Sequence, residues 1–152
     1  MAIEAPASKY KLKTLIIYIV ALVAIAGWCV YDGYFNEKWI EDHKDADGNP
    51  ETYLVFNRKA PPYLGAAAVL IGIYLSMIKN KKILADENGI ILGKRTVSYD
   101  SIEKIDKTQF EPKGYFTITY KNEQSGETDL KISDRDYDNL QELLDHLVAK
   151  IS

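Results

Sequence analysis

Cysteine and histidine are scarce in this chain, with Cys29 and the pair His43 and His146 among 152 residues. A single cysteine excludes an internal disulfide and zinc sites built from paired thiols. So few possible ligands also argue against a structural or catalytic zinc site. Lys and Arg (19) are fewer than Asp and Glu (22), and the net charge is -3. The basic footprint of a nucleic-acid-binding protein is therefore missing.

Charge is also missing from two long runs, residues 14–31 and residues 60–78. A soluble domain has no reason to sort its residues in this way, although its overall composition is ordinary, with 47% hydrophobic and 27% charged residues. The segregation predicts a membrane protein with two transmembrane helices.

The first run, residues 14–31, rises about 27 Å as a helix, which suits the roughly 30 Å hydrocarbon core of a bilayer. A cleaved signal peptide is the alternative, because residues 1–13 form a lysine-bearing polar arm and Ala24-Ile25-Ala26 resembles a cleavage site. The apolar run continues through Trp28 and Tyr31, beyond that point. We therefore expect an uncleaved membrane anchor.

The second run, residues 60–78, contains Pro61 and Pro62 near its beginning. Proline is tolerated in the first turn of a helix, so the pair predicts the start of the second span. A buried helix of a soluble protein is the alternative, but it does not explain two matched spans.

Residues 32–59 form a polar, mainly acidic connection in which a hairpin or a short helix is expected. The segment Asp45-x-Asp47-Gly48-Asn49 resembles the start of a calcium-binding loop. Pro50 and Phe56 occupy the positions where such a loop needs glycine and glutamate. We therefore interpret the segment as an acidic turn and expect no metal site.

Lysines flank the two spans on what should be one side of the membrane. Lys9, Lys11 and Lys13 precede the first span, and the predicted basic anchors Lys79, Lys81 and Lys82 follow the second. The positive-inside rule places both clusters in the cytoplasm and the connection outside. Arg58 and Lys59 oppose this orientation, since they precede the second span.

Aromatic residues gather at the outer end of the first span. They form either an ordinary interfacial belt or an anchor for a partner, including a cofactor-bearing subunit. The candidate anchor consists of Trp28, Tyr31, Tyr34, Phe35 and Trp39. In the second span, Ala68, Gly72 and Ser76 recur at every fourth position, which permits close helix packing. Their partner is either the first span or another protein.

Residues 81–152 read as a small α+β domain. Short strands are predicted at 83–85, 90–92, 97–99 and 102–105, with a turn at 86–89 in which Gly89 can take a positive φ. Residues 115–120 alternate strictly, with Phe116, Ile118 and Tyr120 on one face, and Leu130 and Ile132 mark a returning strand. The pattern predicts an antiparallel sheet or barrel.

The period then changes to that of an amphipathic helix. Ser133 and Asp136 resemble a capping box, and apolar residues recur from Tyr137 to Ile151 at helical spacing. Such a helix can close the open end of a small barrel. The spacing places His146 on the exposed side.

The runs Ile83-Leu-Ala-Asp-Glu-Asn-Gly-Ile-Ile-Leu92 and Val97-Ser-Tyr-Asp-Ser-Ile-Glu-Lys-Ile105 resemble the bacterial pleckstrin-homology-like (PH-like) domain. The resemblance covers about 72 residues and implies a small β barrel closed by a C-terminal helix, here with one or two strands missing. Such domains often follow a pair of membrane helices. Together with the lysines, the resemblance implies a multi-pass protein of the bacterial inner membrane with both termini cytoplasmic.

The resemblance supplies no catalytic residues, and the sequence shows neither a Ser/His/Asp arrangement nor a phosphate-binding glycine loop. The Asp86-Glu87 turn has the wrong charge for binding phosphoinositides. We therefore expect no enzyme, no cofactor and no small-molecule substrate, with the lipid bilayer and integral-membrane proteins as partners. The expected function is an accessory or scaffold subunit of a membrane complex. The alternative is a membrane-anchored regulator or sensor whose PH-like domain binds a peptide or lipid.

Overall fold

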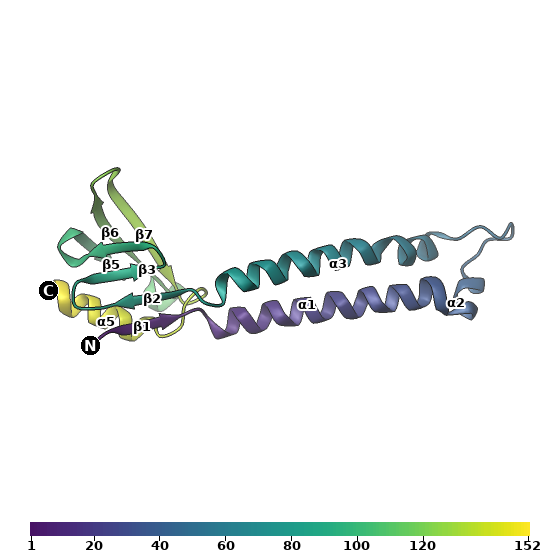
Figure 1. The fold of residues 1–152 in the computed structure, drawn as a ribbon, viewed down its shortest axis with the longest axis horizontal. Coiled ribbons are helices and arrows are strands. Elements are labelled where there is room, and N and C mark those ends of the chain that lie inside the picture. Colours follow the sequence, from purple (N-terminus) through teal and green to yellow (C-terminus); the bar gives the residue numbers. More distant parts are fainter. The chain divides into compact units, whose positions relative to one another are not determined.

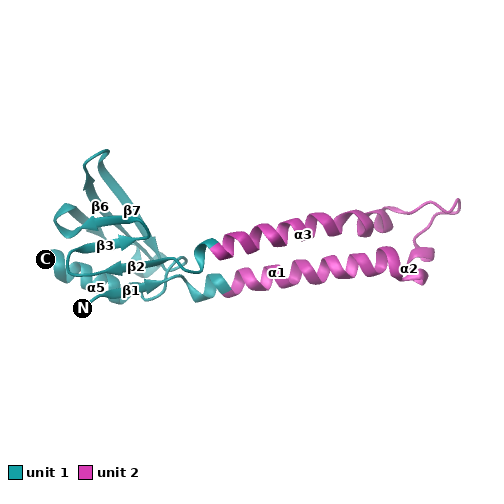
Figure 2. Ribbon diagram, in the orientation of Figure 1, with its two compact units in different colours: residues 1–12, 77–152 teal, residues 13–76 magenta.

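The strand that precedes the first long helix pairs with the strand that follows the second long helix. In the computed structural model, which describes residues 1–152, β1 (Ile3–Pro6) precedes the first long helix and β2 (Lys82–Ala85) follows the second. They are antiparallel neighbours, with Ala5 opposite Ile83. Residues 1–12 and 77–152 consequently form one compact unit (unit 1), and residues 13–76 form another (unit 2), as Figure 2 shows.

Unit 1 contains two small antiparallel sheets (Figure 1). The first has the order β1-β2-β3-β4, where β3 is Gly89–Leu92 and β4 is Arg95–Ser98. The second has the order β5-β6-β7, with bounds Ile102–Asp106, Tyr115–Asn122 and Gly126–Ser133. The predicted strands are all present and the α+β class agrees, but the sheets are separate and no closed barrel is seen.

One hydrophobic core joins the two sheets and the terminal helix α5 (Leu140–Ile151). Strict alternation along β6 turns Phe116, Ile118 and Tyr120 inward, as predicted. Helix α5 contributes Leu140, Leu143, Leu144 and Leu147, which recur on one face. Each buried apolar side chain of this size contributes about 1.5–3 kcal/mol to folding.

The N-terminal residues differ from the expected polar arm over 1–13. Ile3–Pro6 adds the edge strand β1 to the first sheet, and its Ala5 is fully buried. Helix α1 (Lys9–Val30) already begins at Lys9. The hydroxyl of Ser8 and the carboxylate of Asp138 accept hydrogen bonds from backbone N–H groups of the first turn, at 3.4 and 3.0 Å. The arm is therefore part of unit 1.

The terminal helix begins later than the sequence indicated, and the predicted capping box at Ser133 and Asp136 is wrong. Ser133 is the last residue of β7, opposite Tyr115. Residues 136–138 run along β1, where the N–H of Ser8 donates to the carbonyl oxygen of Asp136 at 2.9 Å. Asn139, at φ 62°, then starts α5. The N–H of Tyr137 closes one turn onto the carbonyl oxygen of Ser133, but the carbonyl of Asp136 and the N–H of Asp138 pair with Ser8 and Pro6, so this turn does not continue into α5.

Gly89 was expected to adopt a positive φ, but it does not. A Cβ atom at Gly89 would overlap the carbonyl oxygen of Val97 on the neighbouring strand. The position therefore needs glycine because two strands approach closely, not because of the turn conformation.

Unit 2 contains most of two long helices joined by a short polar connection. Helix α1 continues into the π-helical turn η1 (Tyr31–Phe35), followed by α2 (Glu37–Asp42) and then α3 (Thr52–Ile78). Both helices are longer than the expected spans 14–31 and 60–78. The expected connection 32–59 accordingly includes η1, the predicted short helix and the beginning of α3.

Pro61 and Pro62 lie inside α3, so the prediction that they begin the helix is wrong. A proline cannot donate to the carbonyl group four residues earlier, which frees the carbonyl oxygens of Asn57 and Arg58. The hydroxyl of Tyr34 donates to the carbonyl oxygen of Arg58 at 3.4 Å. The Tyr34 hydroxyl thus satisfies one of the two carbonyl groups that the interior prolines leave without a helical hydrogen bond.

Candidate functional site

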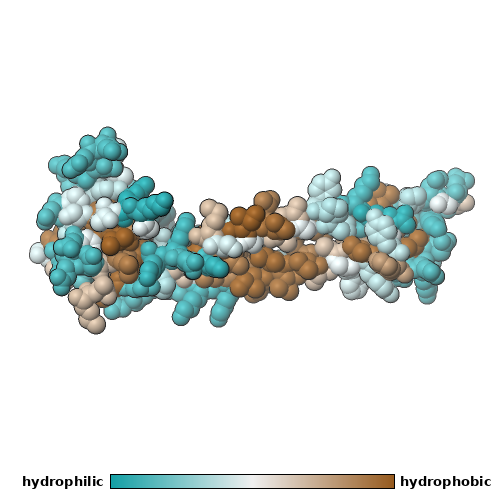
Figure 3. Space-filling view, in the orientation of Figure 1, coloured by the Kyte–Doolittle hydropathy of each residue, from teal (hydrophilic) through white to brown (hydrophobic).

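The most extensive candidate surface is the apolar exterior of the two long helices. Both are long and apolar enough to cross a membrane, and their most apolar windows are only 6% and 11% buried. Figure 3 shows this apolar surface along α1 and α3 and a hydrophilic surface at the connection between them. In water, exposure would forfeit about 1.5–3 kcal/mol for each such side chain. At least half of the side chain is exposed at Ile17, Val20, Val23, Ile25, Val69, Leu70 and Ile73.

The two helices meet at a polar joint between η1 and the first part of α3. The Nε atom of Arg58, on α3, donates to the carbonyl oxygen of Gly33, in η1, at 2.8 Å. The guanidinium carbon of Arg58 also lies 5.6 Å from the ring centroid of Tyr34, a cation–π distance. A Cβ at Gly33 would lie 3.2–3.3 Å from atoms of Asn57 and Arg58. The joint therefore depends on the close approach of a glycine backbone.

A buried carboxylate lies beside this joint. Asp32 is 6% exposed, and its two oxygens accept from the indole Nε1 of Trp28 at 2.5 Å and the amide Nδ2 of Asn36 at 2.9 Å. The N–H of Asn36 donates five residues back, to Tyr31, which defines the π-helical turn. The turn brings all three side chains together. Each carboxylate oxygen has a partner, so the group serves structure rather than ligand binding.

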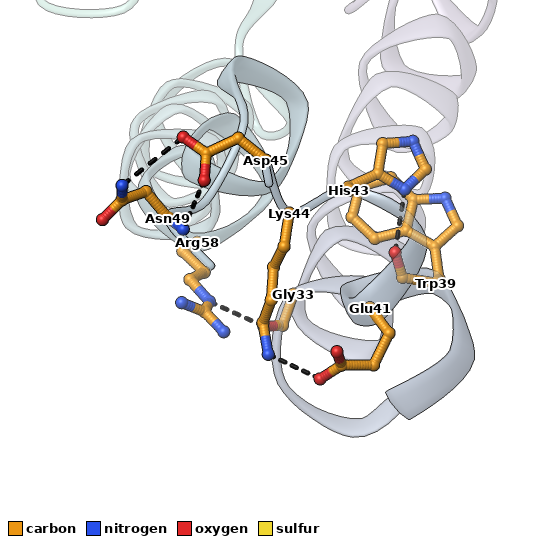
Figure 4. Close-up of polar contacts among 8 residues, drawn as sticks. All are labelled: Gly33, Trp39, Glu41, His43, Lys44, Asp45, Asn49 and Arg58. Carbon is orange, nitrogen blue, oxygen red and sulfur yellow. Dashed lines mark hydrogen bonds and ion pairs between the residues drawn. The ribbon is translucent and has the colours of Figure 1, made fainter. Parts of the chain in front are cut away.

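The connection beyond the joint is held by local contacts (Figure 4). The carboxylate of Asp45 accepts from the backbone N–H groups of Asp47 and Asn49 at 3.0 and 2.8 Å. Its oxygens are therefore directed into their own turn, as expected for an acidic turn. The ring of His43 stacks on Trp39 with centroids 3.8 Å apart, and its Nδ1 lies 2.8 Å from the Trp39 carbonyl oxygen. No group of three or more His, Cys, Asp and Glu side chains could hold a metal ion.

The residues of the predicted aromatic anchor are mainly exposed. Trp28 is 71% exposed although its indole N–H is bonded, and Trp39 is only partly buried against His43. Three further aromatic residues on α3, which the sequence also places at this membrane boundary, are exposed as well. The exposed set comprises Trp28, Tyr31, Tyr34, Phe35, Tyr53, Phe56 and Tyr63. Their rings combine apolar faces with polar atoms, which suits a boundary between water and an apolar phase.

The three residues of the predicted helix-packing stripe differ in how far the rest of the chain covers them. Ala68 is 6% exposed, so it is covered within the chain. Nothing lies within 4 Å of a Cβ built on Gly72, and Ser76 is exposed. The first member of the stripe thus packs inside the chain, whereas the other two leave room for another helix.

The predicted basic anchors lie in unit 1, together with Lys9 and Lys11. The Nζ atom of Lys82 donates to Glu4 at 3.2 Å, and that of Lys11 to Asp136 at 2.6 Å. Lys79 and Lys81 are exposed and make no ion pair. Two of these lysines therefore have no carboxylate within ion-pair distance.

Two of the grooves in unit 1 have partly apolar linings that sequence reasoning missed. One, of about 590 Å³, lies between α4 (Phe110–Lys113) and α5 and is lined by Phe110, Leu144 and Val148 among others. The other, of about 460 Å³, extends from Met77 at the end of α3 onto the outer side of the first sheet. The outward residues Leu84 and Ile91 gave the only sequence signal for it, since they occupy the apolar runs predicted as strands.

His146 is partly buried rather than on the exposed side of α5, so that prediction is wrong. Its Nε2 atom has no hydrogen-bond partner, and its ring centroid is 6.4 Å from that of Tyr99. The 3-10 turn η2 (Tyr99–Ser101) brings Tyr99 against the helix, which helical spacing alone does not reveal.

Comparison with protein-family models, with curated proteins and with solved structures found no match to this chain.

Proposed function

We propose that this chain is a multi-pass membrane protein that acts as a non-enzymatic accessory or scaffold subunit of a larger membrane complex. The observation that carries the proposal is the exposed apolar surface of α1 and α3, which is too extensive for water and suits lipid or other membrane helices. The exposed aromatic residues near the polar joint support insertion, because such residues favour the membrane–water boundary.

The orientation in this proposal places unit 1 in the cytoplasm and the connection between α2 and α3 outside. Unit 1 holds the beginning of α1 and the end of α3, so both helices return to the same side. The lysines at these two ends favour the cytoplasmic side of a bacterial inner membrane.

Unit 1 acts in this proposal as a PH-like contact domain. Two small antiparallel sheets and a terminal helix packed into their common core support the resemblance. Strand β1 supplies an element that the segment 81–152 lacks, which accounts for its short length.

The helix-packing stripe on α3 supports contact with a helix of a partner protein. Gly72 and Ser76 border open space, where another helix can approach closely. A second candidate function, a membrane-anchored regulator whose unit 1 binds a peptide, is favoured by the groove between α4 and α5, because apolar residues there are exposed to a possible ligand.

The test has two stages. The first asks whether the chain remains in membranes after alkaline carbonate washing; extraction would contradict the membrane assignment. The second purifies the tagged native protein in mild detergent and determines the subunit composition by mass spectrometry. Partners at fixed stoichiometry support the subunit function, whereas a particle containing only this chain contradicts it.

A matched pair of variants links that outcome to the stripe. Gly72→Leu fills the open space and should release the partner without unfolding the chain, because nothing lies within 4 Å of a Cβ at this position. Ala66→Leu adds the same side chain at another exposed position of α3 and should leave the complex intact.

A further inference from the structure

The groove at the end of α3 combines an apolar wall with a basic rim. Alternation in β2 and β3 buries Ile83 and Ile90, so Leu84 and Ile91 face the other side of the sheet. These two residues are directly opposite each other in the strand register. With Met77, which is 66% exposed, they line a groove of about 460 Å³. Its wall thus consists of Met77 and the outward face of the sheet.

The rim of this groove carries positive charge that the chain does not neutralise. Asn80, Lys81 and Lys82 form part of the lining. Glu4 already accepts from Lys82, and Asp136 already accepts from Lys11. Lys81 is exposed and has no carboxylate partner. An anion at this position would therefore meet an ammonium group and an amide donor without displacing an existing ion pair.

An apolar wall next to a basic rim selects a ligand with both properties. A free phosphate ion could use the rim but would leave the wall exposed, whereas an uncharged lipid could use the wall but not Lys81. A phospholipid with a net negative headgroup satisfies both. Basic groups near the cytoplasmic end of a membrane helix commonly bind such headgroups.

We propose that the groove formed by Met77, Asn80, Lys81, Lys82, Leu84 and Ile91 binds an anionic phospholipid. The headgroup phosphate is held by Lys81 and Asn80, and part of an acyl chain lies on Leu84, Ile91 and Met77. This inference rests on the proposed function, because it requires the end of α3 to lie at the cytoplasmic surface of a membrane. The lipid would fix unit 1 against that surface.

The test measures lipid retention by the full chain. The detergent-solubilised protein is titrated with dioleoyl phosphatidylglycerol and, separately, with dioleoyl phosphatidylcholine, and bound lipid is counted by native mass spectrometry. Phosphatidylglycerol should bind more tightly. Lys81→Gln should weaken its binding about fivefold, the effect of one lysine at an anionic surface. Lys150→Gln removes the same charge from an exposed position on α5 and should leave binding unchanged.

A second variant tests the apolar wall. Leu84→Thr keeps a strand-forming residue and should also lower the affinity for phosphatidylglycerol. Glycerol phosphate, which has the charge but no acyl chain, should not compete; competition by it would overturn the lipid assignment in favour of a simple anion site. Equal loss in Lys81→Gln and Lys150→Gln would overturn the location.

Carbonate washing separates the two proposals. A chain that stays in the membrane but binds both lipids equally overturns the lipid site alone. A chain that carbonate extracts overturns the membrane assignment and the lipid site together. An acidic peptide that displaces phosphatidylglycerol from the wild type, but not from Lys81→Gln, would replace the lipid with a protein partner.

Discussion

The Nε atom of Arg58 lies 2.8 Å from the carbonyl oxygen of Gly33, and this hydrogen bond joins α3 to the π-helical turn at the end of α1. Two irregularities meet there. Gly33 belongs to the π-helical turn that follows α1. In α3, Pro61 and Pro62 leave two backbone carbonyl groups without their helical hydrogen bonds. The joint thus uses helix irregularities to satisfy polar groups close to an apolar surface.

Gly33→Ala should weaken this joint. The new Cβ would lie 3.2–3.3 Å from atoms of Arg58 and Asn57, so these neighbours must shift by a few tenths of an ångström and the packing around the Arg58 hydrogen bond is disturbed. We expect a loss of about 1–3 kcal/mol in the free energy of unfolding, the usual cost of overpacking. Circular dichroism during denaturation in detergent micelles measures it.

Gly27→Ala provides the matched control on α1. Nothing lies within 4 Å of a Cβ at Gly27, and alanine favours helix by about 0.5–1 kcal/mol. This variant should be unchanged or more stable. Equal destabilisation by both substitutions would show that the close approach at Gly33 is unimportant.

Trp28→Phe should destabilise unit 2 through Asp32. The substitution preserves a large aromatic ring but removes the Nε1–H that donates to the buried carboxylate. A hydrogen bond to a charged group is worth about 1.5–3 kcal/mol, which sets the expected loss of stability. Trp39→Phe is the control, since Trp39 contacts His43 by ring stacking. Denaturation of both variants under the same conditions should show the larger loss for Trp28→Phe.

Much of the fold could be predicted because period-two and helical patterns directly reflect burial. Phe116, Ile118 and Tyr120 on β6 are buried as their alternation required. The division of the chain into two long apolar helices and a small α+β unit could also be predicted from the sequence. The charge-free runs were shorter than the helices, however, because a helix can continue through Asp32 or Arg58 when these side chains find partners.

Long-range pairing explains what could not be predicted. Ile3–Pro6 is too short to show a clear period, and its partner strand begins 76 residues after β1 ends. That pairing also occupies the backbone of residues 136–138, which delays α5 until Leu140. The basic groove at Met77 likewise depends on residues that only the fold brings together.

Tyr137 should titrate at unusually high pH. Burial raises the pKa of its hydroxyl above the ordinary value by disfavouring the phenolate; Asp136 raises it further, and Lys11 partly offsets both. Because the folded pKa is the higher one, this contribution to stability is complete below the unfolded pKa of about 10. It is lost as pH rises through the folded pKa.

Ultraviolet absorbance at alkaline pH, with Tyr137→Phe as reference, identifies this transition. Lys11→Gln should raise the pKa of Tyr137, because it removes a nearby positive charge that favours the phenolate. A downward shift in Lys11→Gln would contradict the assigned electrostatic environment.

Unit 1 should fold without the two long helices if β1 is retained. The N–H of Ala7 donates to the carbonyl oxygen of Lys81 at 2.9 Å, so the chain ends left by removing the helices are already neighbours. Replacing residues 9–79 with two glycines should create a tight hairpin connection between β1 and β2. We expect a water-soluble monomer with cooperative thermal unfolding, measured by circular dichroism and size-exclusion chromatography.

Residues 81–152 alone provide the decisive comparison. Without β1 they expose the edge of β2 and the core around Ala5, which is fully buried in the complete chain. An exposed edge strand promotes association, so this segment should aggregate or unfold non-cooperatively.

Ala5→Asp in the helix-deleted protein should have the same effect, since it buries a charge without a partner. Glu4→Ala, on the exposed side of β1, should cost no more than about 1 kcal/mol. Stable folding of residues 81–152 would mean that β1 is dispensable and that the domain does not require a strand from before the first helix.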